Sequence, residues 1–130
     1  MGLHVGVDFG TSTISAAVWH SQSDTVRVLS SIMKTDGPVP NAIFYTPQQR
    51  HLGIQAQKRS LMSPQHFISN IKRALSGTGW RRSIFDEEKT AVDVMVDIFQ
   101  ILKGNIERNY GDEPIESVVI TVPFAFLYNE

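Results

Sequence analysis

Near the amino terminus, an acidic residue precedes a short run of glycine and hydroxyl side chains. Asp8 lies two residues before Gly10, and Thr11, Ser12 and Thr13 follow directly. Gly10 lets a ligand's oxygens approach the main chain and tolerates the positive φ that a tight turn can require. The three hydroxyls add donors beside the backbone amides, whereas Asp8 would repel phosphate and suits a magnesium ion held through water. These residue types indicate a nucleotide site.

Strands are expected on both sides of this run. Leu3, Val5 and Val7 alternate with polar or small residues, and residues 14–19 resume a strand-like pattern. Residues 9–13 then form a hairpin turn whose N–H groups can converge on one phosphate. An ordinary hairpin with polar turn residues is the alternative, because Asp, Gly, Ser and Thr are common in turns.

Composition narrows the class of protein. The chain has 130 residues, 42% of them hydrophobic, and a formal net charge of −1. We therefore expect one domain, and the charge favours neither nucleic acid nor an anionic membrane as a partner. The absence of cysteine excludes disulfides and thiol catalysis. With no long apolar run and no secretion signal, the cytoplasm is the expected location.

The next part of the chain predicts a mixture of strands and helices. A strand over residues 25–29 would complete an antiparallel meander with the first two. Further short strands are expected at residues 41–45 and 51–52. The period then changes, which predicts a helix over residues 54–62 and a second, continuous helix over residues 63–75.

The last part has a loop, a long helix and a strand. Residues 77–83 predict the loop, and acidic residues at 86–88 are expected in the first turn of a helix that runs to about Asn109. Its apolar stripe, which should pack in the core, is Ala91, Val92, Met95, Ile98, Phe99 and Leu102. The β-branched residues 117–122 predict a strand buried on both faces, and a helix feeding such a strand is typical of an α/β fold.

Four separated stretches resemble one family, the DnaK-type chaperones, also called seventy-kilodalton heat-shock proteins, of the actin-like ATPase superfamily. Residues 7–12 are similar to the family's first phosphate loop, and residues 39–45 to the segment after its third strand. Residues 70–77 resemble its lysine-bearing helix, and residues 120–123 resemble the end of a later strand. The four occur in the family's order and span most of the chain.

The resemblance assigns roles to individual residues. Gly10, Thr11, Ser12 and Thr13 match positions that bind the phosphates of ATP or ADP, and Asp8 matches the carboxylate that holds magnesium through water.

Two further residues match functional positions outside the turn. Lys72 matches the catalytic lysine near the γ-phosphate and the attacking water, and an ammonium on a rigid helix suits phosphoryl transfer. Pro123 matches a proline that takes part in signalling between the nucleotide and peptide-binding domains.

The same resemblance implies a fold and a function. Residues 1–130 would form the N-terminal lobe of an actin-like (ribonuclease H-like) ATPase domain, a mixed sheet with flanking helices, as a fragment of a larger domain. The full-length protein would be a stress-response chaperone that hydrolyses ATP to ADP and phosphate. It would bind unfolded polypeptides, J-domain co-chaperones and nucleotide exchange factors.

Two features limit what this chain should do. Residues 77–85 form only a short loop where the family usually has a longer excursion, which indicates a divergent chaperone-like member. The second phosphate loop, the adenosine pocket and the water-orienting carboxylates would follow Glu130. We therefore expect these residues alone to bind ATP weakly and to have no meaningful hydrolysis activity.

Two other functions stay open. Carbohydrate kinases of the same superfamily share the Asp-x-Gly-Thr turn, but they use a carboxylate base rather than a lysine on this helix, so Lys72 favours the chaperone-type ATPase. The third possibility is a nonenzymatic interaction module on an actin-like scaffold. It would tolerate the loss of Lys72.

Overall fold

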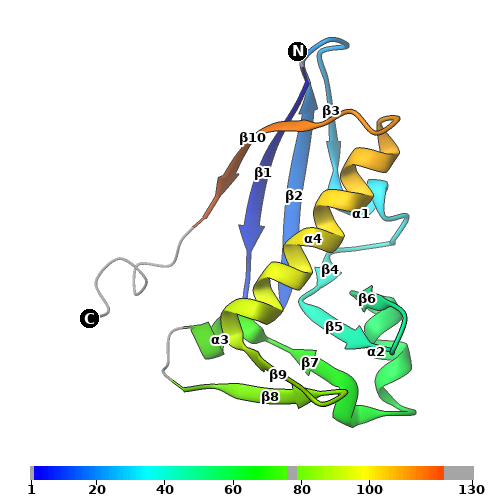
Figure 1. Ribbon diagram of the computed structural model, residues 1–130. Coiled ribbons are helices and arrows are strands. Elements are labelled where there is room, and N and C mark those ends of the chain that lie inside the picture. Colours follow the sequence, from blue (N-terminus) through cyan, green and yellow to red (C-terminus); the bar gives the residue numbers. More distant parts are fainter. Residues whose placement is uncertain (1, 76–78, 122–130) are drawn as a thin grey trace.

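The computed structural model describes residues 2–75 and 79–121, in which a β-sheet is crossed by one long helix and smaller β-units lie at one end (Figure 1). In chain order, the strands are β1 (Leu3–Phe9), β2 (Thr13–His20), β3 (Thr25–Val28), β4 (Val39–Pro40), β5 (Ala42–Tyr45), β6 (Arg50–Leu52), β7 (Phe67–Ser69), β8 (Arg81–Ile84), β9 (Glu87–Thr90) and β10 (Ile115–Ile120). The helices are α1 (Leu29–Ile32), α2 (Ile54–Ser60), α3 (Ile71–Leu75) and α4 (Ala91–Asn109), with a 3-10 turn at Pro64–His66.

The main sheet has the strand order β10-β1-β2-β3, and β4 also pairs with β2. β1, β2 and β3 form the predicted antiparallel meander, while β10 runs parallel to β1. Side chains alternate across β1: Val5, Val7 and Phe9 are buried, whereas Gly6 and Asp8 lie on the exposed face. The predicted mixed sheet with an N-terminal meander is confirmed.

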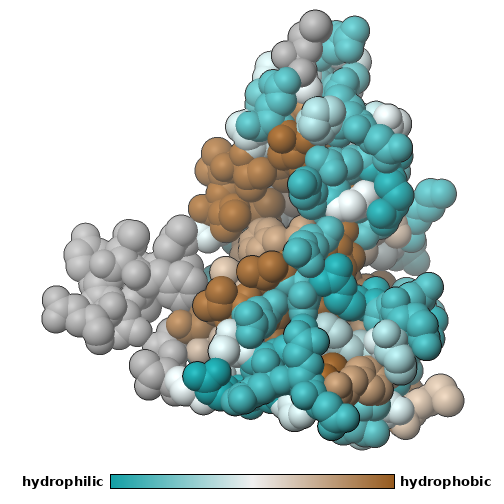
Figure 2. All heavy atoms as spheres, viewed as in Figure 1, coloured by the Kyte–Doolittle hydropathy of each residue, from teal (hydrophilic) through white to brown (hydrophobic). Residues whose placement is uncertain are grey.

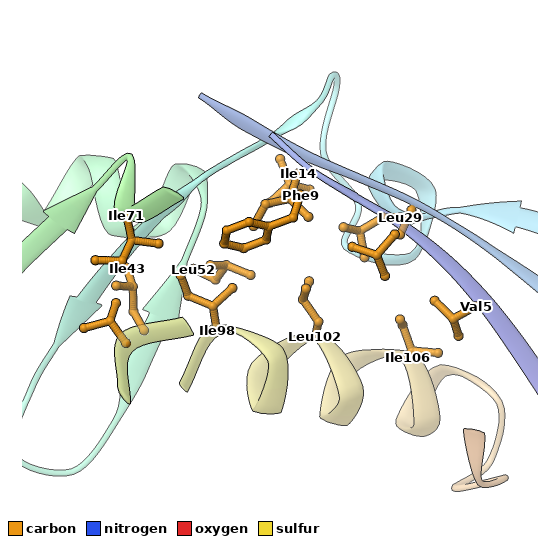
Figure 3. Packing of buried hydrophobic residues seen from close by; sticks show 14 of the residues in the cluster. Val5, Phe9, Ile14, Leu29, Ile43, Leu52, Ile71, Ile98, Leu102 and Ile106 are labelled. Atoms are coloured by element: carbon orange, nitrogen blue, oxygen red, sulfur yellow. The ribbon is translucent and has the colours of Figure 1, made fainter. Parts of the chain in front are cut away.

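α4 lies over the buried face of this sheet (Figure 1), and its apolar residues share one buried cluster with those of β1 and β2. Figure 3 shows Ile98, Leu102 and Ile106 directed from α4 toward the strands. The buried stripe of the helix is Ala91, Val94, Ile98, Leu102 and Ile106. Val92 was expected in this stripe, but it is 57% exposed, because three- and four-residue steps from Ala91 lead through Val94 instead.

The long helix predicted over residues 63–75 is wrong. Pro64–His66 forms a 3-10 turn, Phe67–Ser69 forms β7 and only Ile71–Leu75 is helical. β7 pairs with β5, which buries Ile68 opposite Ile43. Short apolar runs fit either a strand or a helix, and here the available partner strand decides between them.

Among the described residues, the loop predicted over residues 77–83 is confirmed only at Gly79 and Trp80, and the acidic helix start predicted at 86–88 is wrong. Arg81–Ile84 and Glu87–Thr90 pair as a β-hairpin. Phe85 and Asp86 form its turn, with φ values of 47° and 65°. The helix begins only after Thr90, which accepts a hydrogen bond from the Asp93 amide while the Asp93 side chain accepts one from the Thr90 amide. This is a reciprocal capping box.

β10 confirms the predicted strand but not its burial on both faces. Val118, Val119 and Ile120 are 49%, 72% and 42% exposed. In the described part of the chain β10 is an edge strand, with β1 as its only neighbour. Figure 2 shows hydrophobic surface over this side of the sheet.

One carboxylate joins the smaller β-units to α4. Asp97 accepts hydrogen bonds from the Tyr45 hydroxyl at 2.6 Å, from Arg50 at 2.9 Å and from the Lys89 ammonium at 2.9 Å. These donors come from β5, β6 and β9. Burial, followed by the hydrogen bond and the charge of Asp97, raises the pKa of the Tyr45 phenol. The cluster therefore fixes the position of three strands against one turn of the helix.

The capping box should contribute measurably to stability. Thr90→Ala removes the side-chain acceptor for the Asp93 amide, so we expect the free energy of unfolding to fall by about 0.5–2 kcal/mol. Thr90→Ser keeps the hydroxyl and should retain most of that stability. Urea unfolding of the two variants checks this, and equal losses in both would contradict a capping role.

Tyr45 should make stability fall at alkaline pH. An unfolded tyrosine ionises near pH ~10, but the folded protein holds the Tyr45 proton because the pKa is raised. The stabilisation is therefore complete below about pH 10 and decreases as the pH rises further. Tyr45→Phe should cost about 1–3 kcal/mol at neutral pH and show a shallower alkaline loss. Urea unfolding between neutral pH and pH ~11 measures both effects, and an identical pH slope in the variant would disprove the assignment.

Candidate functional site

The predicted turn lies at the end of β1 and β2, where Phe9 pairs with Ile14. The Gly10 amide donates to the Thr13 carbonyl oxygen at 2.9 Å, which closes the hairpin. A Cβ atom on Gly10 would lie 2.6 Å from that same oxygen. Glycine is thus required here by close approach of the backbone. The positive φ expected as a possible second reason is not used at Gly10.

The tip of the turn presents donors without protein partners. Among the described residues, neither the amides of Thr11 and Ser12 nor the hydroxyls of Thr11, Ser12 and Thr13 take part in a hydrogen bond. Ser12 and Thr13 are exposed and Thr11 is half-buried. A group of free N–H and O–H donors around a tight turn can bind the oxygens of an anion.

Asp8 lies beside this turn on the exposed face of the sheet. Its Oδ1 accepts a hydrogen bond from the Thr121 hydroxyl at 3.0 Å, and the Thr121 amide donates to the Val7 carbonyl at 3.0 Å. The end of β10 therefore holds one oxygen of the carboxylate. Sequence reasoning missed Thr121, although a threonine directly after a parallel neighbouring strand is a signal that could have found it.

Asn41 is a second residue that sequence reasoning missed. It is 2% exposed and lies between the turn and β5. Its side-chain Nδ2 donates to the Gly10 carbonyl at 2.7 Å, and its amide donates to the Ser12 carbonyl at 2.9 Å. Its Oδ1 is buried with no protein partner among the described residues, an arrangement that costs about 1–3 kcal/mol.

Lys72 is half-buried in the first turn of α3. The residue before this helix, Asn70, donates its amide to the Asn41 carbonyl at 3.0 Å. Two hydrogen-bonded steps, through Asn41, thus connect the base of the Lys72 helix to Gly10. Figure 1 shows α3 near the same end of β1 and β2. Pro123, the remaining predicted site residue, lies outside the described residues.

Residues 2–75 and 79–121 do not meet the requirements of a directly ligated metal site or of a membrane-spanning helix. No group of three or more His, Cys, Asp or Glu side chains there is arranged to hold a metal ion directly. None of the helices in these ranges has the length and apolarity that a membrane span requires. An Asp8 carboxylate with one remaining oxygen fits a hydrated magnesium ion, which needs few protein ligands.

The close approach at Gly10 gives a direct test of the turn. Gly10→Ala places a methyl group against the Thr13 carbonyl, so the backbone must shift, and we expect a loss of about 1–3 kcal/mol in stability. Gly6→Ala is the matched control, because a Cβ there meets nothing within 4 Å. It should change stability by less than about 0.5 kcal/mol. Urea unfolding measures both variants, and a harmless Gly10→Ala would mean that the turn is not tight.

Comparison with known proteins gives a consistent set of relatives. A sequence model of the family described as "Hsp70 protein" matches residues 4–98. "Chaperone protein DnaK" of Thermoplasma acidophilum is 34% identical over 128 residues, which are 97% of this chain and 21% of the relative. The protein of the same name from Picrophilus torridus is 32% identical over 97% of this chain and 21% of its own length. That of Thermotoga maritima is 32% identical over 94% of this chain and 20% of its own length.

The chain thus spans about a fifth of the length of these curated relatives. The family match covers more than half of the chain. The mixed sheet of this chain, with its antiparallel meander, agrees with the actin-like ATPase fold of that family. The matched residues include the turn, Asn41 and Lys72. The chain belongs to the Hsp70 family.

Proposed function

We propose that residues 1–130 are the N-terminal lobe of an actin-like ATPase domain and that their turn binds the phosphates of ATP and ADP. The observation that carries this proposal is the turn itself. Gly10 closes it at 2.9 Å to Thr13, and the unpaired amides and hydroxyls of its tip lie next to the Asp8 carboxylate. Unpaired donors beside one carboxylate suit a nucleotide phosphate that carries a magnesium ion.

In this proposal the residues in and beside the turn have two roles, binding phosphate and binding magnesium. The Thr11 and Ser12 amides, with the hydroxyls of Thr11, Ser12 and Thr13, donate to phosphate oxygens. Asp8 holds the magnesium ion through water, and Thr121 fixes one of its oxygens so that the other can accept from that water. Magnesium, when bound, compensates the negative charge of the phosphates.

Lys72 supplies the positive charge that the turn lacks. On α3 it would place its ammonium near the γ-phosphate and the attacking water, which stabilises charge as the phosphoryl group is transferred. The connection through Asn70 and Asn41 supports this placement. Pro123 would transmit the nucleotide state to a peptide-binding domain.

The family sets the expected role of the full-length protein. It would couple ATP hydrolysis to the binding of unfolded polypeptide as a cytoplasmic, stress-response chaperone, and would work with J-domain co-chaperones and nucleotide exchange factors. The family match and Lys72 favour this function over a carbohydrate kinase.

The proposal predicts a selective defect when the ammonium is removed. Lys72→Ala in the full-length protein should lower kcat for ATP hydrolysis by about 100-fold or more, because charge stabilisation in the transition state is lost. ATP affinity should change much less. Steady-state phosphate release and a nucleotide titration, both with magnesium, measure the two quantities.

Lys103→Ala is the matched control, since Lys103 is an exposed lysine on α4. It should hydrolyse ATP at the rate of the unaltered protein. An unchanged kcat in Lys72→Ala would rule out the catalytic assignment and favour a nonenzymatic module. Hydrolysis that requires an added sugar would favour a kinase.

A further inference from the structure

We propose that Asn41 is a positioning residue that couples the phosphate turn to the helix carrying Lys72, so that the two sides of the site hold one fixed arrangement. This inference rests on the proposed function and adds a residue to it. Asn41 does not need to touch the nucleotide. It acts through the backbone of the turn on one side and the start of α3 on the other.

On the turn side, Asn41 binds two carbonyl groups. Nδ2 donates to Gly10 at 2.7 Å and the amide donates to Ser12 at 2.9 Å. In a trans peptide the C=O and the following N–H point in opposite directions. Holding the Gly10 carbonyl toward Asn41 therefore directs the Thr11 N–H away from it. Asn41 thus sets the direction of one of the unpaired donors proposed to bind phosphate.

On the helix side, the Asn41 carbonyl accepts the Asn70 amide at 3.0 Å. Asn70 has a φ of 56° and its carbonyl accepts the Arg73 amide at 3.1 Å, so it determines where α3 begins. Ala42 of β5, which follows Asn41, and Ser69 of β7, which precedes Asn70, are paired in the antiparallel ladder. The hydrogen bond between Asn41 and Asn70 therefore extends the ladder between β5 and β7 toward α3.

The burial of Asn41 supports a specific need for its amide group. Among the described residues, Asn41 is the one buried residue with an amide or charged side chain, and its Oδ1 has no protein partner there. An apolar side chain would avoid that unpaired acceptor, but it could not donate to Gly10. The Nδ2 donor is the part of the side chain that the fold uses.

The experiment compares Asn41→Ala with Asn105→Ala in the full-length protein. Asn105 is a matched control, because its Nδ2 also donates to a backbone carbonyl, that of Ile101 at 2.9 Å, but within α4. Both variants should lower the melting temperature. Only Asn41→Ala should weaken magnesium-ATP affinity, by about tenfold, and speed hydrogen exchange of the Gly10 and Asn70 amides without nucleotide. Asn105→Ala should keep affinity within about twofold.

Asn41→Asp tests the donor separately from folding. It has nearly the same shape but cannot donate from a carboxylate, so it should weaken ATP affinity at least as much as Asn41→Ala. Unaltered affinity in either Asn41 variant, or an equal loss in Asn105→Ala, would overturn the coupling. If the unaltered protein binds no ATP, the proposed function fails instead. Hydrogen exchange then decides on Asn41, with faster exchange at both Gly10 and Asn70 required for the coupling to stand.

Discussion

The packing of α4 against the main sheet is the contact on which the rest of the structure depends. Burial of one aliphatic side chain contributes about 1.5–3 kcal/mol, and Ile98, Leu102 and Ile106 all lie in this contact (Figure 3). Because side chains alternate along a strand, burying Val7 and Phe9 against the helix forces Asp8 to the opposite face. The same contact leaves the turn exposed at the end of the sheet.

Hydrophobic periodicity is sufficient to predict the helices and strands in which it continues over many residues. The β1–β2 hairpin and the body of α4 could be predicted from alternation and from three- and four-residue steps. Residues 67–69 could not, because their strand exists only through pairing with β5. The true start of α4 was readable in principle. Thr90 and Asp93 have the spacing of a capping box, but the acidic residues just before them suggested an earlier start.

In the candidate site, too, local features could be predicted from the sequence and long-range contacts could not. Its turn could be predicted from residue types, since a glycine and several hydroxyl residues directly after a strand indicate a tight turn with donors for an anion. Asn41 reaches Gly10 across 31 positions, and no local pattern predicts that contact. Thr121 reaches Asp8 across 113 positions, and only its place directly after a parallel strand could have indicated it. The role of Lys72 came only from family resemblance, because a lone lysine on a short helix is usually a solvated surface residue.

The ion pairs of Asp97 restrict which substitutions the protein can accept around α4. The side chain of Asp97 is 14% exposed and that of Lys89 is 11% exposed, so a neutral residue at 97 would leave the Lys89 ammonium largely desolvated with Glu87, at 3.5 Å, as its remaining ion-pair partner in the described residues. Breaking a buried ion pair from one side costs about 3–5 kcal/mol, whereas replacing all of its members together can cost nothing. Replacing Lys89 and Asp97 together should therefore cost less stability than replacing Asp97 alone.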